Sequence, residues 1–145
     1  MAKSRGAGMG PGETTMTAFP ITSIFTALAA VALVLLSLPV AMRRRRTGLS
    51  LGDGGDESMS RLIRTQGNFI EYVPLILIAM ALAEANGTQP EILWALGGAA
   101  AAGRLLHAMA ILGGTLPPRV AGMLLTWLTL LAAAGVLACG VWGVL

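Results

Sequence analysis

Long apolar segments dominate the chain, and short polar stretches separate them. Residues 18–42 and residues 120–145 contain no charged side chain. About 20 apolar residues are enough to cross a bilayer as a helix, so each segment predicts a membrane span, the second at about residues 120–143. Residues 62–83 and 92–112 are also apolar on average, although each contains polar side chains. The pattern predicts an all-α integral membrane four-helix bundle.

The first apolar segment is too long for a secretory signal peptide, whose apolar region has about 7–15 residues. We therefore expect it to be retained as the first span. The preceding residues 1–17 are rich in glycine and lack apolar periodicity, which predicts a mobile tail. Residues 18–145 then form a single membrane domain.

Three polar loops connect the predicted spans. The first, at about residues 43–60, is rich in glycine, and the second, "EANGTQPE", contains Asn-Gly and Pro, which end one helix and start the next. The third, "GGTLPP", is so short that spans three and four are expected to pack as an antiparallel pair. Loops one and three with their flanks hold Arg43–Arg46, Arg61, Arg64 and Arg119. By the positive-inside rule these two loops should face the cytoplasm, with both termini on the opposite side.

Composition supports a membrane protein and argues against a soluble domain. Of the 145 residues, 55% are hydrophobic and only 12% are charged, about half the charged fraction of a soluble domain. The net charge of +3 owes much to "RRRR" at Arg43–Arg46. Because this run directly follows an apolar segment, it indicates membrane orientation, and we expect no nucleic-acid partner.

Polar side chains form one stripe on the second predicted span. At about 100° per residue, Arg61, Arg64, Asn68, Glu71 and Tyr72 fall within a sector of about 100°. Glu71 lies about 15 Å below Arg61 at about 1.5 Å per residue, which is too deep for its carboxylate to reach water. It should pair with a cation, either Arg64 or a residue of another span.

The third span repeats this theme, because Arg104 and His107 are one turn apart on one face. Arg119 follows at the start of the fourth span. Ionisable residues at depth in a membrane are a functional hypothesis by default. We therefore predict a pocket, open to the cytoplasm between the spans, on which six side chains converge: Arg64, Asn68, Glu71, Arg104, His107 and Arg119.

Structural roles for the same residues stay open. Intramembrane ion pairs can simply lock helices together, Arg119 can be an anchor at the interface, and His107 can be a satisfied bundle residue. Soluble-enzyme motifs do not compete, since the sequence has no P-loop, no G-x-G-x-x-G after a strand and no Cys/His pattern with metal spacing. We expect no metal. The single cysteine, Cys139, excludes an internal disulfide.

These motifs together resemble one family, the membrane-associated proteins in eicosanoid and glutathione metabolism, or MAPEG. "RTQGNFIEYVP" at residues 64–74 is similar to the family's R-x-x-x-N-x-x-E-Y-x-P signature. "GDGGDESMSRLIR" before it resembles bacterial members, and "RLLHAMAILGGTLPPRVAGM" at residues 104–123 resembles the family's third and fourth helices. The resemblance covers about residues 18–145.

The resemblance implies a homotrimer that holds reduced glutathione between neighbouring subunits, near the cytoplasmic face of a bacterial inner membrane. The residues implied in glutathione binding are Arg64, Asn68, Glu71, Tyr72, Arg104 and His107, and Arg119 is implied in stabilising the thiolate. Arginines suit the two carboxylates of glutathione, and a carboxylate suits its amine. Two positions depart from some relatives, since Ile111 and Met123 stand where those relatives have a hydroxyl group.

The resemblance favours a membrane glutathione transferase that acts on lipophilic electrophiles and, by extension, reduces lipid hydroperoxides. Two alternatives are left open. One is a non-catalytic protein of the same fold that binds membrane lipid or acts as a scaffold. The other is a small four-span exporter with Glu71 as its coupling carboxylate.

Overall fold

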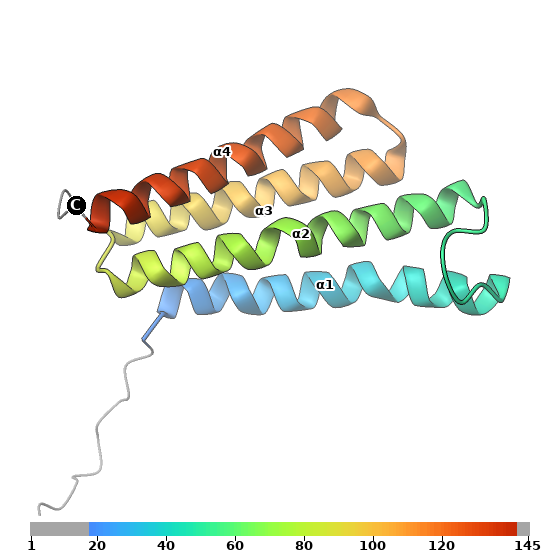
Figure 1. Ribbon diagram of the computed structural model, residues 1–145, viewed down its shortest axis with the longest axis horizontal. Coiled ribbons are helices and arrows are strands. Elements are labelled where there is room, and N and C mark those ends of the chain that lie inside the picture. The colour runs from blue at the N-terminus through green and yellow to red at the C-terminus, as the bar shows by residue number, and fades with distance from the viewer. Residues whose placement is uncertain (1–17, 142–145) are drawn as a thin grey trace, which may run out of the picture.

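Four long helices lie side by side in a computed structural model that describes residues 18–141 (Figure 1). They are α1 (Pro20–Thr47), α2 (Glu57–Ala85), α3 (Pro90–Gly113) and α4 (Leu116–Val141). All four are long and apolar enough to span a membrane, as the sequence predicts. The chain runs up and down, so the α1–α2 and α3–α4 loops share one end of the bundle, which we call the basic end because it carries Arg43–Arg46.

The helices extend beyond the spans that hydropathy alone predicts. The expected loop at residues 43–60 is shorter, because Arg43–Thr47 continue α1 and α2 begins at Glu57. Asp56 explains the early start of α2, since its carboxylate accepts hydrogen bonds from the backbone of Ser58 and Met59 at 3.0 and 3.3 Å. Helix α4 likewise begins at Leu116, before the expected residue 120. The tail expected to be mobile, residues 1–17, lies outside the described residues, as do residues 142–145.

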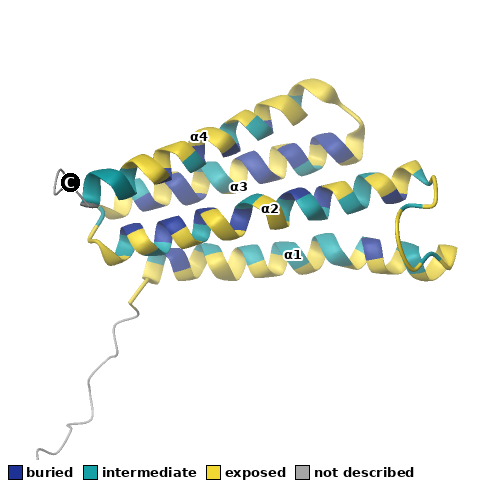
Figure 2. Ribbon diagram, viewed as in Figure 1, coloured by how far each residue is buried: buried dark blue, intermediate teal, exposed yellow. Residues whose placement is uncertain are grey.

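The four helices differ in how much of their surface is buried against other helices, and α1 is the least buried. In the most apolar 18-residue stretch of each helix, only 6% of the residues of α1 are buried, against 39% of those of α3. Figure 2 shows the same contrast, with buried residues concentrated on α2 and α3. The exposed residues of α1 include Leu28, Val31 and Leu35, each about 60% exposed. Water would disfavour such a continuous apolar face, whereas lipid accommodates it.

Helices α3 and α4 are the most extensively packed pair, which confirms the predicted antiparallel arrangement. Two glycines allow their backbones to approach closely. A Cβ atom on Gly122 would lie 2.7 Å from the backbone nitrogen of His107 and 2.8 Å from the carbonyl oxygen of Gly103. A Cβ atom on Gly103 would lie 2.9 Å from Oγ1 of Thr126. This contact places the polar residues of α3 directly against α4.

Helices α1 and α2 are joined at both ends by carboxylates. At the basic end, Arg43 forms a bidentate ion pair with Asp56, at 2.6 and 2.9 Å. At the opposite end, the Glu84 carboxylate accepts hydrogen bonds from the backbone of Ile21 and Thr22 at 2.8 and 2.9 Å. Glu84 thereby caps α1, whose preceding residue Phe19 provides no side-chain cap.

Candidate functional site

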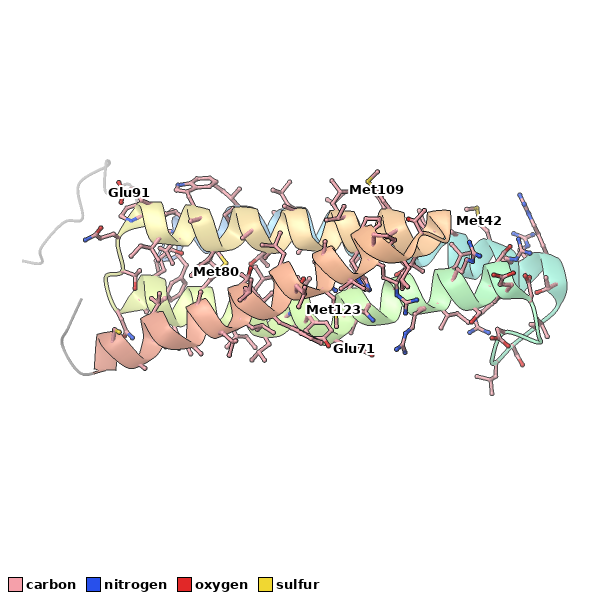
Figure 3. All side chains as sticks on the ribbon, turned by 90° about the horizontal axis from the view of Figure 1, so that it is seen from above. Met42, Glu71, Met80, Glu91, Met109 and Met123 are labelled. Carbon is pink, nitrogen blue, oxygen red and sulfur yellow. The ribbon has the colours of Figure 1, made fainter. Side chains whose placement is uncertain are left out.

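A polar cavity of about 780 Å³ opens at the basic end between α2, α3 and α4. We call it the outer pocket. Its lining has five charged side chains: Glu57, Arg61, Arg64, Glu71 and Arg119. Arg64, Glu71 and Arg119 are exposed in the single subunit, and Figure 3 shows Glu71 at the outer surface of the bundle. The pocket has three guanidinium groups and two carboxylates, and Glu57 forms an ion pair with Arg61. Arg64, Arg119 and Glu71 are left to suit an anionic ligand that also carries an amine.

Arg61 links α2 to the end of α3 beside the outer pocket. Its Nη2 donates to the Glu57 carboxylate at 2.6 Å, and its Nη1 lies 3.5 Å from the carbonyl oxygen of Leu112. Gly114 provides the room, because a Cβ atom there would lie 2.7 Å from Nη1 of Arg61. Gly114 also has a φ of 69°, which ends α3 in the left-handed conformation that favours glycine.

Glu71 forms no ion pair with the cations of residues 18–141. The ion pairs of residues 18–141 are Arg43–Asp56 and Arg61–Glu57. The expected pairing of Glu71 with Arg64 or a residue of another span is therefore wrong for the isolated chain. The physical reason is exposure: Glu71 faces the outer pocket, so its carboxylate does not need a partner inside the bundle.

Arg104 lies at the centre of a second polar group, which is buried. Its Nε and Nη2 donate to Oγ1 of Thr126 at 3.0 and 2.6 Å, and its Nη1 donates to the side chain and the carbonyl of Asn68 at 3.2 and 3.3 Å. Nη2 also lies 3.7 Å from the sulfur of Met123. The guanidinium stands 5.2 Å from the centre of the Tyr72 ring, a distance that allows a cation–π interaction.

This group, which we call the inner cluster, consists of Asn68, Tyr72, Arg104, His107 and Thr126. Asn68, Arg104, His107 and Thr126 are all buried, and Tyr72 is half-buried. Trp127 reaches Tyr72 from α4, with its Nε1 at 3.5 Å from the hydroxyl. Every acceptor around Arg104 is neutral, and no carboxylate of residues 18–141 forms an ion pair with it. The inner cluster is therefore a buried positive charge held by neutral hydrogen bonds.

His107 is oriented by the backbone of α4. Its Nδ1 lies 3.0 Å from the carbonyl oxygen of Arg119. A carbonyl oxygen only accepts, so Nδ1 carries the hydrogen. The other ring nitrogen, Nε2, is buried and has no partner among the described residues.

The six side chains predicted to converge on one pocket are thus divided between two places. Arg64, Glu71 and Arg119 line the outer pocket, whereas Asn68, Arg104 and His107 lie inside the bundle. Helical geometry explains the division, because Asn68 is rotated about 40° from Arg64 at about 100° per residue. That rotation turns Asn68 toward α3 while Arg64 faces outward.

Sequence reasoning missed Thr126, the main acceptor for Arg104. The signal that could have found it is the α3–α4 turn: in an antiparallel pair, residues equally far from the turn lie opposite each other, and positions 104 and 126 are both 11 residues from Thr115. It also missed Arg61 as a lining residue of the outer pocket. As for metals, no group of three or more His, Cys, Asp or Glu side chains suited to an ion occurs within residues 18–141.

Comparison with known proteins assigns this architecture to a family. The model of the MAPEG family matches residues 22–139, a range that includes most of all four helices. The chain belongs to the MAPEG family. It is accordingly an integral membrane protein with the family's four-helix bundle, as the second-span signature indicated.

Among curated MAPEG-like relatives, the chain is similar to two bacterial proteins. Both are called inner membrane protein YecN, one from Escherichia coli strain K12 and the other from strain O6:H1. Each is 31% identical over 111 residues, which cover 77% of this chain and 85% of the relative. Their names state a location and no activity.

Proposed function

We propose that this MAPEG protein is a membrane-bound glutathione transferase that conjugates glutathione to lipophilic electrophiles. The outer pocket is the observation that carries the proposal. Glutathione has two carboxylates, one amine and one thiol, and the pocket provides Arg64, Arg119 and Glu71, with Arg61 beside them in an ion pair with Glu57. Guanidinium groups bind carboxylates well, and the Glu71 carboxylate would receive the amine.

Arg119 is the residue proposed to act on the thiol. A thiol with a pKa near 8.5 is mostly protonated at neutral pH, and an adjacent guanidinium favours the thiolate. Arg119 is exposed at the start of α4 and is free of ion pairs within residues 18–141. The thiolate would attack an electrophilic carbon, form the S–C bond and expel the leaving group.

Lipid hydroperoxides extend this proposal. Two glutathione molecules would be oxidised to the disulfide while the hydroperoxide is reduced to an alcohol and water.

The inner cluster has a different role in this proposal, because it would hold the helices that form the outer pocket in place. Its contacts join α2 to α3 and α3 to α4, through Asn68, Tyr72, Arg104 and His107. For glutathione to touch these side chains directly, the peptide would have to reach past the exposed residues of the outer pocket.

The homotrimer and the orientation belong to the same proposal. The outer pocket is open on the side of the single subunit, and a neighbouring copy would enclose a tripeptide there. The density of arginine at the basic end supports a cytoplasmic location of that end by the positive-inside rule. A bacterial inner membrane suits the names of the relatives.

The decisive experiment uses purified protein in detergent. Thiolate absorbance would be followed on addition of glutathione, and product formation would be followed with an aryl halide. We expect a saturable thiolate signal and turnover. Absence of glutathione binding at millimolar concentration would refute the proposal. Binding without turnover would instead favour the non-catalytic member of the fold, and Glu71-dependent, proton-coupled efflux from vesicles would favour the exporter.

A further inference from the structure

A second cavity, of about 300 Å³, lies between α1, α2 and α3. We call it the inner cavity. Its lining is almost entirely apolar, and it extends along α3 from Gly97 to Ala108, which is about 16 Å at about 1.5 Å per residue. The volume is at the lower end of the range typical of small-molecule pockets. Its elongated shape suits a hydrocarbon chain.

The cavity is open to the surroundings of the bundle through exposed leucines. Leu28 and Leu35 of α1 and Leu105 of α3 line it and are each at least 60% exposed. In a membrane these side chains face lipid, so a molecule dissolved in the bilayer reaches the cavity sideways. The outer pocket lies on the α4 side of α2 and α3, so this route is separate from the one available to a water-soluble ligand.

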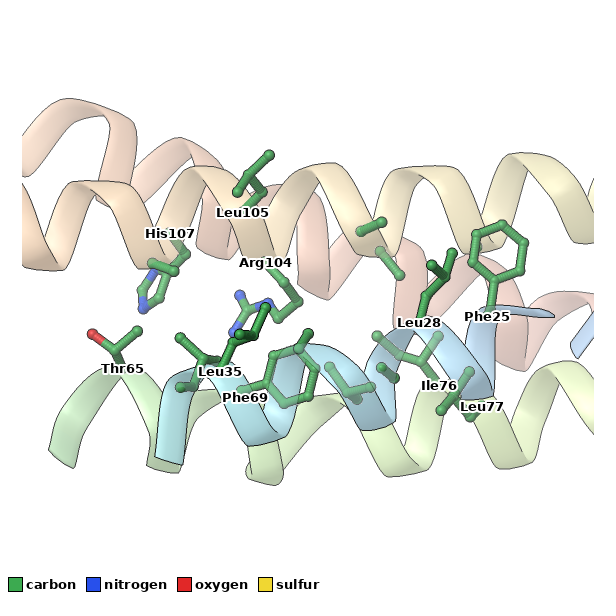
Figure 4. A pocket seen from close by; sticks show the side chains of 18 of the residues that line it. Phe25, Leu28, Leu35, Thr65, Phe69, Ile76, Leu77, Arg104, Leu105 and His107 are labelled. Atoms are coloured by element: carbon green, nitrogen blue, oxygen red, sulfur yellow. The ribbon is translucent and has the colours of Figure 1, made fainter. Parts of the chain in front are cut away.

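One end of this apolar cavity is polar. His107, Arg104 and Thr65 line it there, and Figure 4 shows the His107 ring pointing from α3 toward Thr65 of α2. His107 is 4% exposed, and its Nε2 has no partner among the described residues. Because Nδ1 donates to the Arg119 carbonyl, the neutral ring presents a lone pair at Nε2. A buried acceptor without a donor is costly, so this position calls for one.

The neighbouring residues do not provide that donor. Oγ1 of Thr65 donates to the carbonyl of Arg61 at 2.8 Å. The N–H groups of Arg104 are directed to Thr126, Asn68 and Met123. Arg104 still contributes its positive charge, which favours an electron-rich oxygen close by. The ligand group that satisfies both neighbours is a hydroxyl, which donates its hydrogen to Nε2 and keeps its oxygen lone pairs toward the guanidinium.

We propose that the inner cavity binds a lipophilic chain that ends in a hydroxyl group, with the O–H hydrogen-bonded to Nε2 of His107. Alcohols and hydroperoxides share this O–H donor. The site is distinct from the outer pocket and does not depend on glutathione. The chain occupies the space between α1 and α3, and the hydroxyl lies beside Arg104.

Photolabelling of the full-length protein in detergent tests the proposal. The probe is a saturated medium-chain primary alcohol with a diazirine in the chain, used without glutathione, so the result is independent of the proposed transferase activity. Competitors are the unlabelled alcohol and its methyl ether, which has the same shape and no O–H. We expect labelling at cavity residues of α1 and α3. The alcohol should compete about tenfold better than the ether, as one hydrogen bond to a buried acceptor implies.

Two pairs of variants isolate the contacts. His107→Phe keeps a ring and removes the acceptor, so alcohol and ether should compete equally; His107→Gln restores an acceptor and should recover part of the preference. Ala32→Leu fills the cavity from α1 and should abolish labelling of α3, whereas Ala30→Leu, on the same helix outside the lining, should leave it unchanged. Thermal unfolding of each variant establishes that it is folded.

Three outcomes would overturn the proposal. Equal competition by alcohol and ether in the unmodified protein would mean that the cavity takes a plain hydrocarbon chain. Labelling spread evenly over all four helices would mean that no site exists. If Ala32→Leu disrupted subunit association and left labelling unchanged, the space would belong to a second copy of the chain.

Discussion

The outer pocket and the inner cavity are both lined by α2 and α3, yet they have opposite characters. The outer pocket is large, polar and open, and its charged residues other than the half-buried Arg61 are exposed. The inner cavity is smaller and apolar, and its polar residues, Arg104 and His107, are buried at one end. Helix α2 contributes to both, with Arg64 and Glu71 on one side and Thr65 on the other.

This difference teaches that a stripe of polar residues is not necessarily a single site. Exposed charges such as Arg64 and Arg119 are free to bind a ligand, because little structure depends on them. Arg104 is in the opposite situation, since Asn68 and Thr126 depend on it for their hydrogen bonds. Substitutions should therefore separate residues that bind from residues that hold the bundle together.

Arg104→Met should have the largest effect, and on stability. It removes the N–H groups that donate to Asn68 and Thr126 inside the bundle. Leaving these two buried acceptors without a donor should lower the free energy of unfolding by about 3 kcal/mol in total. Thermal unfolding in detergent should move to lower temperature, while glutathione affinity of the folded fraction changes little. A fall in glutathione affinity at unchanged stability would instead make Arg104 a direct ligand.

Arg119→Ala should have the next largest effect, and on turnover alone. If Arg119 stabilises the thiolate, kcat with an aryl halide should fall about 100-fold, as for loss of one group that stabilises a transition-state anion. The backbone carbonyl that holds His107 is retained in this variant, so unfolding should be unchanged. Arg45→Ala is the matched control, because Arg45 is exposed at the same end and outside the pocket. Equal losses in the two variants would indicate a general charge effect.

Gly122→Ala should destabilise the inner cluster from the side of α4. The added methyl group would meet the backbone of His107 at 2.7 Å, and forcing α3 and α4 apart costs about 2 kcal/mol. Gly135→Ala on the same helix is the control, since a Cβ atom there meets nothing within 4 Å. Equal unfolding temperatures for the two variants would show that the close approach is not needed.

The smallest effect is expected at the basic end, where charge rather than packing joins two helices. The hydrogen bonds from Arg43 hold the pKa of the Asp56 carboxyl below its ordinary value. A lowered pKa in the folded state gives stability that is present above the unfolded value of about 3.9 and is lost as the pH falls through the folded value. The temperature of thermal unfolding should therefore fall on acidification below about pH 4.

Asp56→Asn separates this ion pair from the helix cap, because asparagine caps α2 as well as aspartate does. The variant should lose the part of the acid dependence that comes from Asp56 and keep the inner cluster intact. An unchanged pH profile would mean that the ion pair contributes nothing measurable, as is common for exposed pairs.

Much of the fold was predictable because lipid imposes strict demands on a chain. Four apolar segments of sufficient length predict four helices, and the short loop at Gly113–Gly114 predicts the pairing of α3 with α4. Helix ends were less predictable, because they depend on single caps such as Asp56 and not on average hydropathy.

Most charged residues of the candidate site were predictable, but Glu57 and Arg61 of the outer pocket were not, and neither was the division of the site in two. Ionisable side chains in an apolar segment are conspicuous, which is why Arg64, Glu71 and Arg104 were found. Whether each faces inward depends on the rotation of its helix against its neighbours, and periodicity within one helix does not provide that angle. Thr126 went unnoticed because a threonine in an apolar helix is ordinary until an arginine is placed opposite it.

The contact of Glu84 with α1 has a consequence for how the chain enters a membrane. The first amides of α1 need an acceptor, and the one they use comes from the last turn of α2. During synthesis α1 emerges first, but its leading end is complete only after α2 has crossed and delivered Glu84. This cap of α1 therefore depends on the hairpin of both helices, and a chain that stops before Glu84 would lack the acceptor for the amides of Ile21 and Thr22.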